Sequence, residues 1–407
     1  MTESTGNTAG PGSAAGSAAG PGSAAGTGSA AAGGGRAAQL RSSGLRPGWT
    51  TGACATAATK AAYTALLGGE FPDPVVITLP KGQQPAFALA GEELTPGPDG
   101  PAAMAAVVKD AGDDPDVTHG AVVRATVRPG APGTGVVFRA GPGVGTVTKP
   151  GLPLAVGEPA INPVPRQLMC EVVAEVAAAH GASGDVEIEI SIDNGAEIAR
   201  STWNPRLGIL GGLSVLGTTG VVVPYSCSAW IDSIRRGVDV ARAAGRTHVA
   251  GCTGSTSERV AVAEYGLAED ALLDMGDFAG AVLKYLRRHP VDRLTIAGGF
   301  AKLSKLAAGH LDLHSARSQV DKGFLASLAR TAGADEELVA AVAAANTGLQ
   351  AVQLCRAAGV PLGDAVARAA RETALDVLRE APVAVDVICI DRAGTVVGRC
   401  EPRTNRG

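Results

Sequence analysis

The feature that most constrains the fold is a regular alternation of strand and helix patterns after Gly245. Apolar runs typical of buried strands alternate with segments of helical period. The expected strands are 247–250, 271–275 and 293–297, and the expected helices begin at about 257, 278 and 301. This β-α-β-α-β order predicts a parallel sheet with helices on both faces. We therefore expect a Rossmann-like, doubly wound α/β domain over 226–407, completed by Ala-rich helices at 324–380 and a hairpin at 383–399.

A different pattern precedes this domain and predicts an α+β domain over 45–225. We expect strands at 74–79, 87–89, 122–127, 136–138 and 185–192, helices at 52–67, 104–111 and 165–179, and a hairpin turn at 193–195. Thr50 or Thr51 is suited to cap the first helix. Residues 1–44 repeat the low-complexity unit GPGSAAG, which predicts a disordered tail before the two α/β domains.

The stretch 194–226 is rich in glycine and apolar residues and closes the first predicted domain. Its six glycines allow tight turns and close backbone approach. Two interpretations remain open, a buried junction between the domains and a ligand cleft lined by backbone. Composition alone favours the junction.

Charge and cysteine content exclude several classes of function. The formal net charge is −4 and no basic block occurs, so we expect no nucleic-acid partner. No run of 18 apolar residues occurs, so we expect no membrane span. The seven cysteines form no C-x-x-C pair, which indicates reduced thiols in a cytoplasmic protein. An oligomer stays possible.

The first βα turn of the second domain is a candidate nucleotide-type site. Gly251, Thr253 and Gly254 lie in this turn, and Asp274 follows 23 residues beyond Gly251 at the end of the next strand. An acid at this place accepts hydrogen bonds from ribose hydroxyls. Since the full G-x-G-x-x-G is absent, an ordinary turn with a surface aspartate is an equal alternative.

Two further groups have a spacing that suits anion binding or proton transfer. Gly298 and Gly299 open a helix that carries Lys302 and Lys305, which suits a carboxylate, although solvated lysines are the simpler interpretation. His310 and His314 have i, i+4 spacing, but no third ligand is evident and we expect no metal site. Asp312 or His314 is a better candidate for a general base. The residues by themselves leave the reaction open.

Five segments together resemble one family. They are GWTTGACATAATKAA (48–62), GVGTVTKPGLPLAVGEPAINPVPR (143–166), GAEIARSTWNPRLGILGGLSVLGTTGVV (195–222), AGGFAKLSKLAAG (297–309) and DLHSARSQVD (312–321). They are similar to the cobalt-precorrin-5B C1-methyltransferase family (CbiD) of cobalamin biosynthesis. The resemblance implies methylation of C1 of cobalt-precorrin-5B by S-adenosylmethionine, giving cobalt-precorrin-6A.

The resemblance also implies roles for the candidate residues. The donor would bind at Gly251, Thr253, Gly254, Asp274, Gly298 and Gly299. The corrinoid, an apolar macrocycle with carboxylate arms, would meet Thr50, Thr51, Lys149, Arg166, Asn204, Arg206, Thr218, Thr219, Lys302 and Lys305. Asp312 and His314 would settle any proton transfer, and the protein needs no metal ligand because cobalt arrives within the substrate.

Two other functions are weighed beside this one. The first is a nucleotide-dependent reductase that acts on a corrinoid, and the second is a tetrapyrrole carrier without enzymatic activity. Binding of S-adenosylhomocysteine but not NADPH would favour the transferase.

Overall fold

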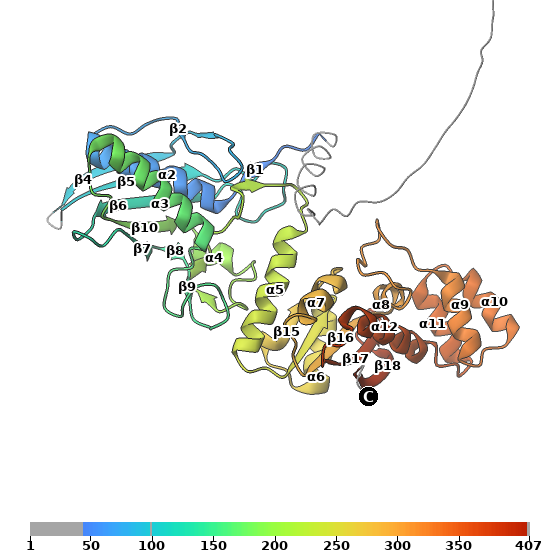
Figure 1. Cartoon of the computed structure of the whole chain (residues 1–407). Helices are drawn as coiled ribbons and strands as arrows, with labels where there is room; N and C mark the ends of the chain where they lie inside the picture. Colours follow the sequence, from blue (N-terminus) through green and yellow to red (C-terminus); the bar gives the residue numbers. More distant parts are fainter. Residues whose placement is uncertain (1–43, 98–99, 405–407) are drawn as a thin grey trace, which may run out of the picture. The chain divides into compact units, whose positions relative to one another are not determined.

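The computed structural model describes residues 44–97 and 100–404 (Figure 1). The chain divides into Met1–Leu45 and Arg46–Gly407, and the fold described here is that of the second unit. Of the predicted tail, residues 1–43 lie outside the described residues. The described part has a mixed α/β architecture.

The first half of this unit contains a five-stranded sheet, with strand order β4-β5-β6-β10-β7, and several two-stranded pairings. Its elements are β1 (Gly48–Trp49), α2 (Thr51–Gly68), β2 (Val75–Val76), β3 (Ala86–Phe87), β4 (Gly91–Gly97), β5 (Gly100–Val108), β6 (Val122–Pro129), β7 (Val136–Ala140), β8 (Gly143–Val144), β9 (Thr146–Val147), α3 (Pro163–His180), β10 (Val186–Ile192), α4 (Gly195–Ala199), β11 (Ile209–Leu210), β12 (Gly212–Leu213) and β13 (Val221–Val222).

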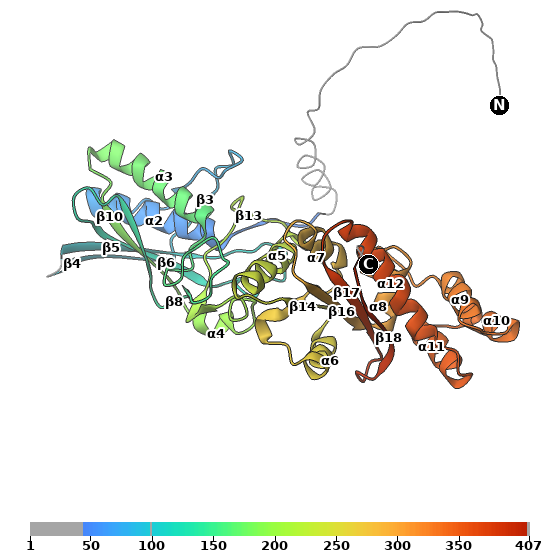
Figure 2. The ribbon, with the colours of Figure 1, turned by 60° about the horizontal axis from the view of Figure 1, so that its bottom comes forward.

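Helix α2 is the centre of the first hydrophobic core. Its alanines are fully buried, because side chains this small let the helix lie close to the sheet. Helix α3 packs along α2, and its apolar residues join the same cluster (Figures 1 and 2). Thr50 caps α2, since its Oγ1 accepts a hydrogen bond from the Ala53 N–H at 3.2 Å. The predicted first helix is confirmed.

Two expectations in this half are wrong. Residues 104–111 form no helix, since most of them belong to β5. The helix propensity of alanine is overridden because Ala103, Ala105 and Val107 alternate onto the buried face of the sheet. The turn at 193–195 makes no hairpin: Asn194 is left-handed, but the chain then enters α4.

The glycine-rich stretch 194–226 packs against backbone. A Cβ on Gly195 or on Gly212 would lie 2.2 Å from the Gly143 oxygen. At Gly217, where φ is +134°, a Cβ would lie 2.3 Å from Thr50 Oγ1. These glycines therefore serve close packing within the first half of the fold.

The second half is built on a sheet with strand order β15-β14-β16-β17-β18. The first four strands are parallel, and β18 is antiparallel to β17. The elements are α5 (Ser228–Ala243), β14 (His248–Cys252), α6 (Ser255–Tyr265), η1 (Glu269–Ala271), β15 (Leu272–Asp274), α7 (Ala279–Leu286), β16 (Arg293–Gly299), α8 (Phe300–Ala307), α9 (Lys322–Thr331), α10 (Glu336–Ala344), α11 (Gly348–Ala357), α12 (Leu362–Leu378), β17 (Ala384–Ile390) and β18 (Val396–Arg403). The predicted parallel alternation and the C-terminal hairpin are both confirmed.

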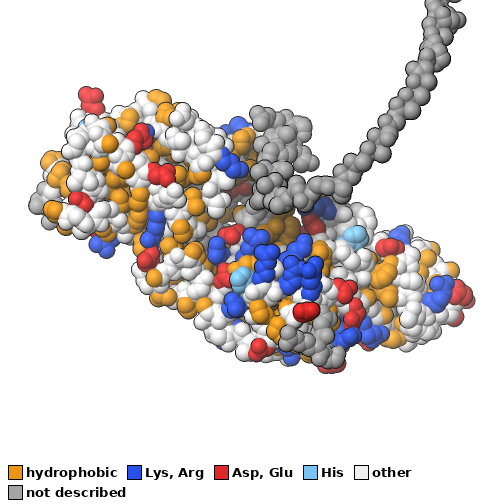
Figure 3. All heavy atoms as spheres, viewed as in Figure 1, with side chains coloured by type: hydrophobic (Ala, Val, Ile, Leu, Met, Phe, Trp, Pro, Cys, Tyr) orange, Lys and Arg blue, Asp and Glu red, His pale blue; other side chains and the backbone are white. Residues whose placement is uncertain are grey.

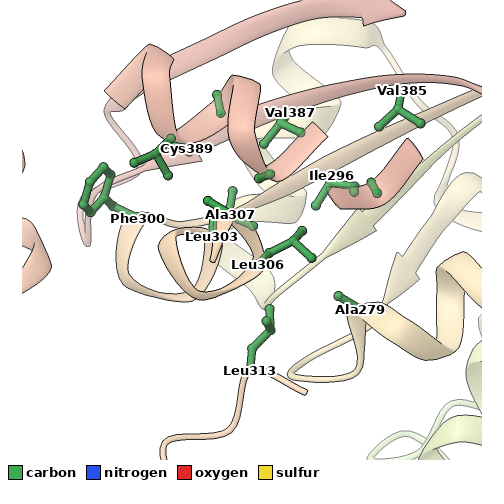
Figure 4. Packing of buried hydrophobic residues seen from close by; sticks show 14 of the residues in the cluster. Ala279, Ile296, Phe300, Leu303, Leu306, Ala307, Leu313, Val385, Val387 and Cys389 are labelled. Carbon is green, nitrogen blue, oxygen red and sulfur yellow. The ribbon is translucent and has the colours of Figure 1, made fainter. Parts of the chain in front are cut away.

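Helices cover both faces of this sheet (Figure 2). On β17, Val385 and Val387 face the cluster formed with α5, α7, α8 and α12, whereas Ile388 and Ile390 face α6. Figure 4 shows the first of these clusters, in which Leu303 and Leu306 of α8 lie beneath the strand residues. Burial on both faces is typical of parallel sheets.

Within the described residues, no helix is both long enough and apolar enough to cross a bilayer.

Candidate functional site

The candidate site lies at the carboxyl ends of β14, β15 and β16. The chain runs from β14 to β15 on one side and then returns to β16 on the other, so the strand order reverses between β14 and β16. Open parallel sheets bind ligands at this switch point because the two connecting segments diverge there. The strand ends thus define where the chemistry of this sheet is to be sought.

Thr253 and the Gly298-Gly299 pair meet across the switch point. The Thr253 N–H donates to the Ala297 oxygen at 3.0 Å, and Thr253 Oγ1 accepts from the Gly299 N–H at 3.4 Å. A Cβ on Gly298 would lie 2.6 Å from the Thr253 methyl, so glycine is required for this contact. Contrary to the prediction, Gly251 does not belong to the turn but is buried inside β14, where it faces Met275. The turn itself is formed by Thr253 and Gly254.

Asp274 ends β15 with one carboxylate oxygen unused by the described part of the chain. Its Oδ1 accepts a hydrogen bond from the Gly276 N–H at 3.2 Å, whereas no described residue donates to Oδ2. Partial burial, together with the negative charge of Glu258, raises the pKa of Asp274. Oδ2 can therefore accept a further hydrogen bond.

Arg206 joins the glycine-rich stretch to α6 through a bidentate ion pair with Glu258. Arg206 Nη1 lies 2.6 Å from Glu258 Oε1, and Nη2 lies 2.8 Å from Oε2. Glu258 is buried, with 8% of its surface exposed. The guanidinium also lies 5.2 Å from the centre of the Trp203 ring. Arg206 is thus committed to the protein and not free for a substrate carboxylate.

An aromatic row flanks Asp274. Trp230 of α5 stands between Trp203 and Phe278, with ring centroids 6.2 Å apart on each side. The Trp230 Nε1–H donates to the Asp274 backbone oxygen at 3.1 Å. Two of the three tryptophans in the chain therefore gather at one strand end.

The two predicted lysines of α8 are engaged with neighbouring loops. Lys302 Nζ lies 3.1 Å from the Thr253 oxygen and 3.1 Å from Asp277 Oδ1. Lys305 is buried, its Nζ donates to the Leu313 oxygen at 2.8 Å, and burial lowers the pKa of its ammonium group. These bonds hold the loops that follow β15 and α8 at the site.

Asp312 and His314 lie on the second of these loops. The Leu313 N–H donates to the Asp277 oxygen at 2.8 Å, and the Leu313 side chain points toward α8 (Figure 4). Asp312 Oδ2 pairs with Arg317 at 2.6 Å, and His314 Nδ1 accepts from the Ala316 N–H at 3.2 Å. Each side chain thus bonds within its own loop, and the neutral form of His314 presents an Nε2–H donor.

The sequence comparisons agree on the family. Residues 38–224 match the family model described as CbiD, and residues 312–401 match that of the CbiD C-terminal domain. Over 354 residues the chain is 65% identical to the cobalt-precorrin-5B C(1)-methyltransferase of Paramagnetospirillum magneticum, covering 87% of this chain and 98% of the relative. The chain belongs to the CbiD family. A protein of the same name from Brucella anthropi is 63% identical over 355 residues, which is 87% of this chain and 95% of that relative.

One solved structure also matches this CbiD family member. It is the cobalamin biosynthesis protein CbiD of Archaeoglobus fulgidus, with 23% sequence identity and a TM-score of 0.37, covering 77% of this chain and 85% of that one.

Several polar residues that the CbiD resemblance assigns to the substrate are engaged elsewhere. Thr50 and Thr51 are buried at the start of α2. Lys149 lies 3.6 Å from Asp270, and Arg166 donates to the oxygens of Ile161 and Pro159. Asn204 is buried and accepts from Ser214 at 3.1 Å, and Thr219 bonds to the Val221 backbone. Thr218 is exposed. The structure does not gather these side chains around the strand ends.

Sequence reasoning missed Glu258, Trp203 and Trp230. Glu258 resembled an ordinary helix residue, and no local pattern links the two tryptophans; the low aromatic content, at 3%, was the available signal. It also missed a basic surface: Lys and Arg side chains gather over α5 and α7 (Figure 3). The exposed cations of these helices include Arg235, Arg242 and Lys284, and the exposed Arg288 follows α7.

Among the described residues, no three His, Cys, Asp or Glu side chains are grouped as metal ligands would be.

Proposed function

We propose that this chain methylates C1 of cobalt-precorrin-5B with S-adenosylmethionine, giving cobalt-precorrin-6A in cobalamin biosynthesis. The observation that carries the proposal is the 65% identity to a protein named cobalt-precorrin-5B C(1)-methyltransferase, over 98% of that relative. Cobalt enters as part of the corrinoid substrate.

The proposal divides the chain into an α+β domain over 45–225 and a Rossmann-like domain over 226–407. Two separate hydrophobic clusters support this division, since one is formed by residues from Ala53 to Val215 and the other by residues from Ile234 to Cys389. The strand order and the helices on both faces fit a doubly wound domain.

The residues at the switch point fit the donor. Asp274 offers the unused Oδ2 to the ribose hydroxyls, which are the partners of an acid at this strand end. Thr253, Gly254, Gly298 and Gly299 place no bulky side chain at these strand ends. When bound, S-adenosylmethionine supplies an electrophilic methyl group, so the work left to the chain is alignment.

The remaining residues hold this arrangement. Lys302 ties the Thr253 turn to Asp277, and Lys305 ties α8 to the loop of Asp312. His314 Nδ1 already accepts from a backbone N–H and its neutral ring has no other acceptor. Asp312 accepts from the His314 N–H at 3.1 Å and from Arg317 at 2.6 Å, but each of its carboxylate oxygens keeps a further lone pair. We keep Asp312 as the base and assign His314 the role of a hydrogen-bond donor.

The thiols fit a cytoplasmic site of action. All seven cysteines are free in the structure, and burial raises the pKa of Cys54 to about 12. Thiols of this kind persist in a reducing compartment.

The decisive experiment incubates the folded chain with cobalt-precorrin-5B and methyl-labelled donor. We expect a product heavier by one methyl group, and we expect calorimetry to detect binding of S-adenosylhomocysteine but not of NADPH. Asp274→Ala is expected to weaken the binding of S-adenosylhomocysteine. Folded protein that yields no labelled product would refute the assignment, and tight NADPH binding would favour a reductase.

A further inference from the structure

The indole of Trp230 is held rigidly and yet remains exposed. Its Nε1–H bond to the Asp274 oxygen fixes the ring direction. Trp203 and Phe278 contact it at interplanar angles of 57° and 60°. Below the ring, a Cβ on Gly276 would lie 3.0 Å from Trp230 Cζ2, so glycine is what lets the indole lie on this turn. Nevertheless 41% of Trp230 is exposed.

A fixed, exposed aromatic ring is suited to stack on a flat ligand. The ring has already lost its conformational freedom, so a ligand that stacks on it does not have to order it. Burying the indole would remove apolar surface from water, and a π system stacks favourably on a second flat ring. Large aromatic surface left exposed at a strand end therefore points to a ligand rather than to the core.

The position of Trp230 selects the part of the ligand that stacks. The residue that receives the indole N–H is the same residue whose carboxylate is offered to the ribose. In a nucleoside the base is attached to C1′, which is bonded to the carbon that carries the 2′-hydroxyl. A ribose held by Asp274 thus carries its base to the immediate surroundings of this carboxylate, where Trp230 is the exposed aromatic surface.

We propose that the indole of Trp230 stacks on the adenine of the methyl donor, with Trp203 and Phe278 as the residues that position it. This inference rests on the proposed function and deepens it, since it names the base-recognition residue of the donor site. Stacking is sequence-tolerant chemistry that depends on the ring and not on the indole N–H.

The test is calorimetric titration of the full chain with S-adenosylhomocysteine and with adenosine. Trp230→Ala is expected to weaken the binding of both ligands about tenfold, which is the affinity that stacking of one base contributes. Trp230→Phe keeps an aromatic ring and is expected to stay within about threefold of the wild type. Tyr225→Ala is the matched control, because Tyr225 is 68% exposed and lies outside the aromatic row. Its affinity for both ligands is expected to be unchanged.

A second readout reports on the ring directly. In the double variant Trp49→Phe, Trp203→Phe, Trp230 is the remaining tryptophan, and adenosine is expected to quench its fluorescence. The inference would be overturned, with the proposed function intact, if Trp230→Ala bound both ligands as tightly as the wild type and adenosine did not quench the fluorescence of Trp230. Equal weakening by Trp230→Ala and Trp230→Phe would also overturn it, since the bond to Asp274 would then be what matters. If the wild-type chain binds no S-adenosylhomocysteine, the proposed function itself is refuted.

Discussion

Removal of the Arg206 guanidinium should expose the cost of a buried, unpaired carboxylate. In the wild type, two charge-assisted hydrogen bonds of 2.6 and 2.8 Å neutralise Glu258, whose side chain is 10% exposed. Breaking a buried pair by deleting one partner costs about 3–5 kcal/mol. Since the Arg206 side chain is 31% exposed, water screens part of the interaction. We therefore expect Arg206→Ala to lose about 3 kcal/mol of unfolding free energy.

Urea unfolding of four chains measures this loss. The chains are the wild type, Arg206→Ala, Glu258→Gln and the double variant, in which we expect about 2 kcal/mol of the combined loss to be recovered. Arg330→Ala is the matched control, because Arg330 makes the same bidentate contact with Glu336 at 2.7 and 2.8 Å, but at the surface. The side chains of Arg330 and Glu336 are 54% and 76% exposed, so water screens this pair and the control should lose much less stability than Arg206→Ala. If Arg206→Ala loses no more than this control, the reasoning is refuted.

The same variants should shift the pH dependence of donor binding in opposite directions. The positive charge of Arg206 lowers the pKa of Asp274, and the negative charge of Glu258 raises it. An ionised Asp274 is the better acceptor for ribose hydroxyls. The pH midpoint of S-adenosylhomocysteine binding should therefore rise in Arg206→Ala and fall in Glu258→Gln. Midpoints that move in the same direction would contradict this account.

Three further changes test the fold. The pKa of Asp274 is higher in the folded chain than in the unfolded chain, so the folded chain loses stability as pH rises through the range between these two pKa values. The melting temperature of Asp274→Asn should therefore be higher than that of the wild type at pH 7 but not in acid. Gly212→Ala should lose about 3 kcal/mol in urea unfolding, since its Cβ would meet the Gly143 oxygen at 2.2 Å. Lys109→Met should lose about 3 kcal/mol of unfolding free energy, because it removes the buried ammonium group that lies 2.6 Å from Asp116 Oδ2.

Each of these has a control or a contrary outcome. Gly299→Ala meets no atom within 4 Å and should unfold as the wild type does. Lys60→Met removes a pair with Glu175, which is 61% exposed, and a hydrogen bond to the Val76 oxygen, so it should lose less stability than Lys109→Met. A lower melting temperature for Asp274→Asn at pH 7 would mean that the carboxylate stabilises the fold.

Local patterns predicted the second half of the fold well and the first half in part. The alternation after Gly245 predicted β14, β15 and β16 to within a few residues, because buried parallel strands and amphipathic helices have distinct periods. The helix expected at 104–111 failed because alanine suits both structures, and only packing against α2 selects the strand. Likewise β10 lies between β6 and β7, although β6 and β7 come closer in the sequence. Strand neighbours of this kind depend on burial, which a short window does not contain.

What the sequence determined by itself is the order of elements in the second half, its parallel sheet and the family, since these depend on periodicity and on long specific segments. The tertiary structure alone decided which polar groups are available. It paired Arg206 with Glu258 and directed Lys305 to a backbone oxygen, because a buried charge must find a partner wherever the fold provides one. It also brought Trp203, Trp230 and Phe278 together beside Asp274. These contacts join residues far apart in the chain, so chain spacing carries no trace of them.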